Sequence, residues 1–168
     1  MRKNMKVIDQ SLISDLSNKA LLNERKRANY NLHDDLSDNI HRFFNAMEPG
    51  TYVRPHRHYE DNKWELFVII RGKVIAIEFE DSGIIKSKHV LEPSTDVIAI
   101  EIPEKTWHTL ACLEAGTVLF EVKKGPYSPT SDKDFADWAP KEGDLNTQQF
   151  LNWFCTGAVG SKPPGCNT

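Results

Sequence analysis

The segment Gly50-Thr51-Tyr52-Val53-Arg54-Pro55-His56-Arg57-His58, followed by Glu65, decides how this chain folds. His56 and His58 are two residues apart in a β-rich run. Side chains alternate along a strand, so both imidazoles point to the same face. Glu65 begins the next apolar strand, and His108 begins a later β run. The sequence therefore predicts that three histidines and one glutamate converge inside a β-structure.

This set of residues has the donor chemistry of a metal site. Three imidazole nitrogens and one carboxylate suit one divalent transition metal: Fe, Mn, Ni, Co or Zn. Such a site leaves coordination positions open for water or substrate, which catalysis requires. A His-x-His pair alone is more typical of surface or hydrogen-bonded histidines. The arrangement of all four residues, His56, His58, Glu65 and His108, is what favours a metal.

Short β-rich runs separated by turn residues extend from Thr51 to Lys123. Their number and spacing predict a sandwich or barrel. Glycines in Arg71-Gly72-Lys73 and Asp81-Ser82-Gly83 predict tight hairpins and antiparallel order. The expected strands are 51–57, 64–71, 73–80, 84–91, 96–102, 106–113 and 117–123.

Both ends of the chain differ from this β-rich centre. Helical spacing of apolar residues predicts a short helix from Asp9, its N-cap, to about Lys19. A second helix is expected around Phe150 to Phe154, with Asn146 as its cap. We expect one domain in three parts: an N-terminal helix and arm, in which 21–48 is an arm or short helix on the main body, a barrel, and a C-terminal loop, helix and loose tail. Their ranges are 1–48, 49–127 and 128–168.

Composition narrows the class of protein. The 168 residues carry a net charge of −3, which provides no broad positive field for nucleic acid or an anionic membrane. The longest apolar run, Leu66 to Ile70, is too short to cross a bilayer, so we expect a cytoplasmic protein. Cys112, Cys155 and Cys166 include no Cys-x-x-Cys pair, which predicts reduced thiols, with Cys112 in the core.

Two stretches resemble the motifs of the cupin superfamily. Gly50-x5-His56-x-His58-x6-Glu65-x6-Gly72 resembles the first cupin motif, and Pro103-x-Lys105-x2-His108 resembles the second. The resemblance implies an all-β fold, the cupin double-stranded β-helix or jelly-roll barrel, here with short N-terminal and C-terminal helices. The chain departs from the pattern in a longer gap between His58 and Glu65, in Lys105 at the usual glycine and in Cys112 at a frequent asparagine.

Further stretches resemble the WbuC-type cupin-fold metalloproteins, over roughly residues 8 to 144. That family implies a link to bacterial surface-polysaccharide gene clusters and has no assigned reaction. The stretches are Asn31-Leu32-His33, the 50–58 segment, Lys63-Trp64-Glu65, Glu121-Val122-Lys123, Gly125-Pro126-Tyr127 and Asp132-Lys133-Asp134-Phe135-Ala136.

Candidate substrate-binding and catalytic residues follow from strand parity and position. Tyr52 and Arg54 lie an even number of residues before His56, so in a regular strand their side chains would point to the same face as its imidazole. Arg54 either clamps a substrate anion or forms a salt bridge at the rim. Glu121, in an apolar run, is either a pocket acid/base or an outward-facing residue. The remaining candidates are Tyr127 as a second proton-transfer group, Lys63 at the rim and His33 at the pocket mouth.

These observations predict a metal-dependent enzyme of the isomerase, epimerase or dioxygenase type. Its substrate would be a sugar-like or oxygen-rich metabolite, by analogy with the polysaccharide association. The alternative is a non-catalytic, metal-dependent module that binds or senses a small ligand. An assembly protein is least favoured, because it leaves the four-residue cluster without purpose. We expect a small-molecule partner and no nucleic-acid or membrane partner, and a homodimer is compatible with the sequence.

Overall fold

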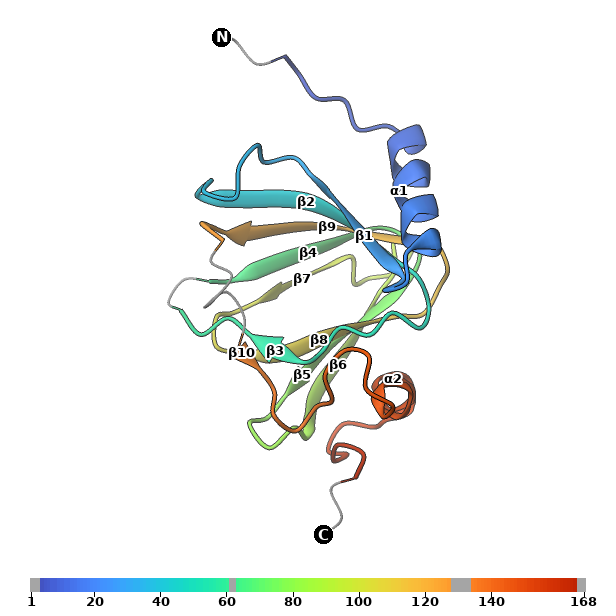
Figure 1. The fold of residues 1–168 in the computed structure, drawn as a ribbon, viewed down its shortest axis with the longest axis vertical. Coiled ribbons are helices and arrows are strands. Elements are labelled where there is room, and N and C mark those ends of the chain that lie inside the picture. The colour runs from blue at the N-terminus through green and yellow to red at the C-terminus, as the bar shows by residue number, and fades with distance from the viewer. Residues whose placement is uncertain (1–3, 61–62, 128–133, 166–168) are drawn as a thin grey trace.

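Two antiparallel sheets of five strands face each other in the computed structural model, which describes residues 4–60, 63–127 and 134–165 (Figure 1). The first sheet has the order β1 (Arg27–Asn31), β2 (Ile40–Met47), β9 (Thr117–Lys124), β4 (Glu65–Arg71) and β7 (Ala99–Ile102). The second has the order β10 (Asp134–Phe135), β3 (His56–Arg57), β8 (Trp107–Cys112), β5 (Val74–Phe79) and β6 (Ile85–Leu91). Consecutive strands often lie in different sheets, which is the order of a jelly roll.

Two helices pack on the outer faces of the sheets. Helix α1 (Gln10–Leu22) begins where predicted, because Asp9 Oδ1 accepts a hydrogen bond from the Leu12 amide at 2.9 Å. Its buried side chains form one cluster with first-sheet residues: Ile13, Leu16 and Ala20 with Phe44, Ala46 and Val118. Helix α2 (Thr147–Thr156) is also confirmed, although the Asn146 side chain makes no capping hydrogen bond.

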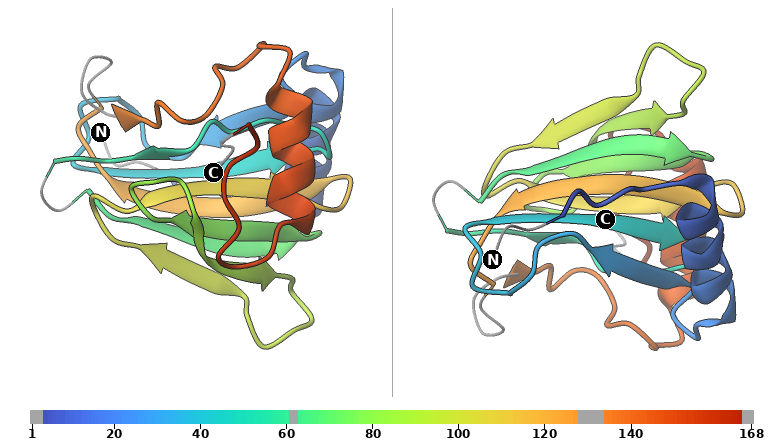
Figure 2. Two further views of the ribbon diagram at one scale, coloured as in Figure 1. Left: turned by 90° about the horizontal axis from the view of Figure 1, so that it is seen from below. Right: turned by 90° about the horizontal axis from the view of Figure 1, so that it is seen from above.

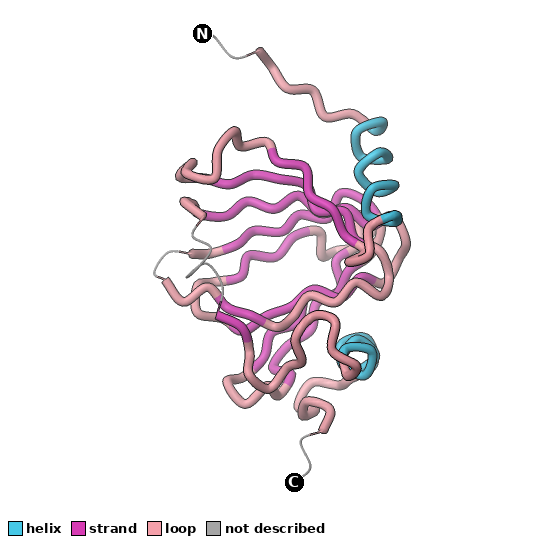
Figure 3. Tube along the Cα trace, in the orientation of Figure 1, coloured by secondary structure: helices cyan, strands magenta, loops and turns pink. Residues whose placement is uncertain are grey.

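Helix α2 covers the second sheet with aromatic side chains. Phe150, Trp153 and Phe154 form a cluster with Phe79 and Ile85. Figures 2 and 3 show that both helices lie at the same end of the strands. The apolar interior between the sheets includes Phe67, Ile69, Val74, Leu110 and Leu119. No helix of the described part of the chain is long and apolar enough to span a membrane.

The segment 21–48 differs from its prediction. It is not an arm or helix, because residues 27–31 and 40–47 form β1 and β2 of the first sheet. In β2, Phe44 packs toward α1 while Met47 packs into the interior. A strand buried on both faces loses the alternation of polar and apolar residues that identifies strands in a sequence.

One of the two predicted hairpins is also wrong. Gly83 does lie in a turn between paired strands, β5 and β6. The Gly72 turn, however, connects β4 of the first sheet to β5 of the second. Gly72 has a φ of +79°, and a Cβ there would lie 2.7 Å from the Thr117 Cα. Glycine at this position is therefore required by the corner between the sheets.

Replacing Gly72 with alanine tests this constraint. We expect a loss of about 2–4 kcal/mol in the free energy of unfolding, from left-handed backbone strain and from overpacking against Thr117. Gly143 is the matched control: its φ is +92°, but a Cβ would meet nothing within 4 Å. Gly143→Ala should cost about 1 kcal/mol from strain alone. Equal losses in urea unfolding would contradict a close approach at Gly72.

The cysteines provide a second test. Cys112 is buried and Cys155 is exposed, both as free thiols, while Cys166 lies outside the described residues. Burial raises the pKa of the Cys112 thiol to about 11. At pH 8 iodoacetamide should alkylate Cys155 quickly and Cys112 only after denaturation, because the thiolate is the reacting form. Peptide mapping reads out both sites.

The same pKa shift gives a pH dependence of stability. The folded state holds the Cys112 proton more tightly than the unfolded state, so this contribution is complete below about pH 9. It is lost as the pH rises toward 11. Cys112→Ala should therefore lose less stability than the wild type between pH 9 and 11. Rapid native alkylation of Cys112 would contradict this assignment.

Candidate metal centre

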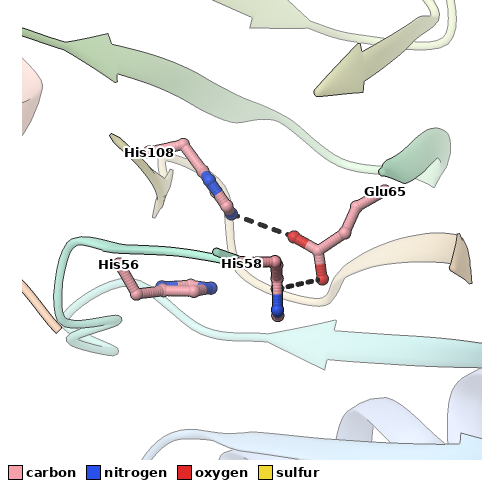
Figure 4. A group of neighbouring side chains, drawn as sticks. All are labelled: His56, His58, Glu65 and His108. Atoms are coloured by element: carbon pink, nitrogen blue, oxygen red, sulfur yellow. Dashed lines mark ion pairs between the residues drawn. The ribbon is translucent and has the colours of Figure 1, made fainter. Parts of the chain in front are cut away.

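Three different strands bring the four predicted ligands together. His56 lies in β3 and is paired in register with His108 of β8. His58 follows two residues later, and Glu65 is the first residue of β4 in the opposite sheet. All four side chains are buried, and their ligand atoms lie within 4.8 Å of one another (Figure 4). The cluster thus joins the two sheets where they face each other.

Backbone hydrogen bonds orient two of the imidazoles. The Nδ1 of His56 lies 2.9 Å from the Arg54 carbonyl, and the Nδ1 of His108 lies 2.9 Å from the Thr106 carbonyl. A carbonyl can only accept, so each Nδ1 carries the proton. In a neutral ring the lone pair is then on Nε2. Such a bond to the far nitrogen is typical of metal-ligating histidines.

Glu65 faces two of these rings. Its Oε1 is 3.0 Å from His58 Nε2, and its Oε2 is 3.0 Å from His108 Nε2. Figure 4 shows the carboxylate turned toward both rings. His108 Nε2 and Glu65 Oε2 are fully buried and make no hydrogen bond of normal geometry. Two lone-pair atoms at this distance repel each other unless a cation, either a proton or a metal ion, lies between them.

The carboxyl group of Glu65 is held in its charged form. Burial alone would raise its pKa, but the close imidazoles of His108 and His58 and the ammonium group of Lys123 hold the pKa well below its usual range. Lys123 Nζ lies 3.5 Å from Glu65 Oε1. An ionised carboxylate beside three imidazoles fits a divalent transition metal, as the sequence predicts. These residues can therefore hold a metal; its identity and number stay a prediction.

A cavity of about 940 Å³ opens beside the cluster. Three of its lining residues, Met47, Phe67 and Leu110, also belong to the apolar interior, so the core forms its inner wall. Three of the ligands, His56, Glu65 and His108, reach the cavity surface. The candidate metal site is thus adjacent to a space large enough for a small-molecule ligand.

Four of the six other predicted site residues line this cavity. Arg54 donates from Nη2 to the Ala136 carbonyl at 2.7 Å, and its guanidinium lies over the Phe135 ring. Glu121 is buried, accepts a hydrogen bond from Asn45 and lies 3.7 Å from Lys123 Nζ. The remaining two are His33, stacked on His41 with ring centroids 4.2 Å apart, and Tyr127, which is partly exposed.

Tyr52 and Lys63 lie elsewhere. The Tyr52 hydroxyl donates to the Pro140 carbonyl, and its ring stacks on Phe154 beneath α2. The parity argument fails for Tyr52 because the regular strand begins only at His56. Lys63 is buried and donates to the Pro126 carbonyl at 2.8 Å. Its contact holds the segment before Tyr127, and neither Tyr52 nor Lys63 lines the cavity described above.

Sequence reasoning missed several polar residues of the cavity, among them His41, Asn45 and Lys123. Lys123 is two residues after Glu121 in β9, so the alternation used for the histidines would have found it. His41 and Asn45 share a face of β2 with Phe43, but this signal requires that 40–47 be identified as a strand.

Lys105 stands where the second cupin motif usually has glycine, yet it keeps the backbone conformation that glycine favours. Lys105 has a φ of 64°, in the left-handed region that glycine favours, where the second cupin motif has its glycine. Its amide donates to the His58 carbonyl at 2.8 Å. The turn before His108 is therefore tied to the loop that carries His58.

Comparison with known proteins places the chain in a family. Residues 8–91, half of the chain, match the family model described as "Domain of unknown function (DUF6016)". The chain belongs to this family. The matched range contains His56, His58 and Glu65 of the DUF6016 chain. No curated protein is significantly similar to it. The WbuC-type assignment stays a prediction.

Solved structures share the architecture at low identity. The conserved SPY1581 protein of unknown function from Streptococcus pyogenes is 13% identical, with 76% of this chain and 93% of that chain covered and a TM-score of 0.51. The TT1209 protein from Thermus thermophilus is 17% identical, with 71% and 97% covered and a TM-score of 0.50. A cupin superfamily protein from Desulfitobacterium hafniense is 16% identical, with 65% and 86% covered and a TM-score of 0.48.

Structural similarity at these sequence identities is evidence for a shared fold only. The order of the strands in the two sheets confirms the predicted all-β, jelly-roll fold.

Removing two of the imidazoles tests the metal centre. The His56→Ala/His58→Ala variant should lose most of the bound transition metal, because half of the ligand set is gone. Elemental analysis of protein purified without added metal gives the content. His89→Ala, which removes an exposed histidine outside the cluster, is the control and should retain it. Equal metal content in wild type and double variant would refute the ligand assignment.

Proposed function

We propose that this DUF6016 chain is a metal-dependent enzyme that acts on a small, oxygen-rich metabolite. One observation carries the proposal: the metal-ligand cluster, a carboxylate and a guanidinium group line the same cavity. A closed structural metal site would need neither the cavity nor the additional charged groups. When bound, a divalent metal would polarise a carbonyl or hydroxyl oxygen of the ligand.

Arg54 is the substrate anchor in this proposal. In the described part of the chain its guanidinium has no carboxylate partner, and its Nε is buried without a hydrogen bond. An uncompensated guanidinium in a cavity favours a carboxylate, a phosphate or several hydroxyl groups. The hydrogen bond to Ala136 and the Phe135 ring fix its orientation.

Glu121 is the proton-transfer group. The amide of Asn45 and the ammonium group of Lys123 both stabilise its charged form, so it would accept a proton rather than donate one. Lys123 also contacts Glu65, which places Glu121 close to the metal ligands. Tyr127, at the exposed end of the cavity, is the second candidate for this role.

The reaction class follows from these groups. A metal, a base and an anchor for oxygen-rich ligands support isomerase or epimerase chemistry, and the open site also supports reaction with O₂. The sugar-like substrate and the link to surface-polysaccharide biosynthesis rest on the WbuC resemblance. Tyr52 and Lys63 take structural roles in the proposal because of their hydrogen bonds outside the cavity.

Two substitutions test the assigned roles. Metal-replete protein is screened against sugars, sugar nucleotides and small keto and hydroxy acids. With any active substrate, Arg54→Lys should raise KM about tenfold or more, because the bidentate contact is lost. Glu121→Gln should lower kcat about 10²–10⁴-fold with KM nearly unchanged. Wild-type kinetics in both variants would remove these residues from the mechanism.

The exposed Glu101 of β7 provides the control, since Glu101→Gln removes a carboxylate outside this cavity and should leave kinetics unchanged. Binding without turnover for every substrate class would instead indicate a binding or sensing module.

A further inference from the structure

A row of polar side chains crosses the inner face of the first sheet. We call it the polar track: Asn29, Asn45, Glu121, Lys123 and Glu65, from four adjacent strands, β1, β2, β9 and β4 (Figure 1). Asn29 and Asn45 are register partners. Asn45 donates to Glu121, and Lys123 bridges Glu121 and Glu65. The track therefore runs without interruption from the metal ligands to the edge strand β1.

The length of the track exceeds what a ligand held at the metal would use. Neighbouring strands are about 4.8 Å apart, so β4 and β1 are separated by about 14 Å. The cavity continues over this whole distance, because it is lined from Glu65 to Asn29 and Asn31. This span is longer than a single sugar ring or a small organic acid.

The distal end of the track is polar, and its charged groups are paired with one another. Arg25 and Arg27 line the cavity there, and both pair with the single carboxylate of Glu142, with N–O distances of 2.8 and 2.9 Å. Asn29 and Asn31 are exposed, and their side-chain amides make no hydrogen bond to the described part of the chain. An uncharged amide both donates and accepts, as a hydroxyl group does. The two asparagine side chains therefore favour hydroxyl groups of a ligand.

Apolar side chains also line the cavity along the polar track. Phe43 and Met47 alternate with Asn45 on the same face of β2, and both line the cavity. A sugar unit combines hydroxyl groups at its edges with a face of C–H groups, which matches this surface.

We propose that the ligand is an extended saccharide of at least two units, with one end at the metal centre and the other at Asn29 and Asn31. This inference rests on the proposed function, which it deepens by naming the substrate class. The metal-distal unit hydrogen-bonds to the asparagines of β1, and the intervening part crosses Asn45 and Glu121.

The test compares ligand lengths. Binding of mono-, di- and trisaccharides of glucose, galactose, N-acetylglucosamine and glucuronic acid to metal-replete protein is measured by calorimetry and ligand-observed NMR. The wild type should bind a di- or trisaccharide at least tenfold more tightly than the matching monosaccharide. Asn29→Ala/Asn31→Ala should lose this gain and keep the monosaccharide affinity. Tyr30→Ala, between them and outside the cavity lining, should retain it.

A second variant, Asn29→Ser/Asn31→Ser, keeps short polar side chains and should lose the same gain, and thermal unfolding verifies the fold of each variant. Equal affinity for all lengths, a gain that survives both double variants, or no saccharide binding would overturn the inference. Turnover of a non-sugar substrate would then leave the proposed function standing. Asparagine-dependent saccharide binding without turnover of any substrate would support the inference and overturn the enzyme assignment.

Discussion

The carboxylate of Glu65 is buried between two sheets, against imidazoles that come from the opposite sheet. Removing an ionised carboxylate from water costs several kcal/mol even in a relaxed protein interior. Lys123 offsets part of this cost, and a cation shared with His58 and His108 can offset the rest. The facing of the sheets, the register of β3 with β8 and the turn at Lys105 all keep these few atoms together.

The space between the two sheets has an apolar part and a polar part. Apolar side chains such as Ile69, Val74 and Leu119 fill one part, and the polar cavity occupies the other. Both helices pack on outer faces at one end of the strands, where they bury aromatic and aliphatic side chains. Part of the stability is thus provided by surfaces that do not line the cavity. A rigid scaffold of this kind can hold ligand-binding side chains in place.

Charge compensation inside the cavity determines which groups are available to a ligand. Lys123 lies between Glu65 and Glu121, and Glu142 binds both Arg25 and Arg27. Arg54 stands apart, because its hydrogen bond is to a backbone carbonyl. The cavity therefore combines a guanidinium near the metal ligands, unpaired among the described residues, with neutral amides, and two arginines that share one carboxylate, farther away. A ligand with a charged or oxygen-rich end and a hydroxylated remainder matches this distribution.

The sequence by itself determined the helix caps, most strand positions and the four clustered residues. Those signals are local: Asp9 caps its own helix, and His56 and His58 share a face through alternation alone. The motif spacing added Glu65 and His108. The sequence could not identify β2, because burial on both of its faces removes the alternating pattern. For the same reason His41 and Asn45 were missed.

Only the tertiary structure decided which strands face each other, and so which side chains share the cavity. Tyr52 and Arg54 are two residues apart, and in a regular strand their side chains would point to the same face. The chain before His56 is not a regular strand, so Tyr52 packs beneath α2 while Arg54 lines the cavity. The tertiary structure also placed β4 and β5 in different sheets across Gly72. Pairing across many residues depends on packing between distant segments, which no local pattern encodes.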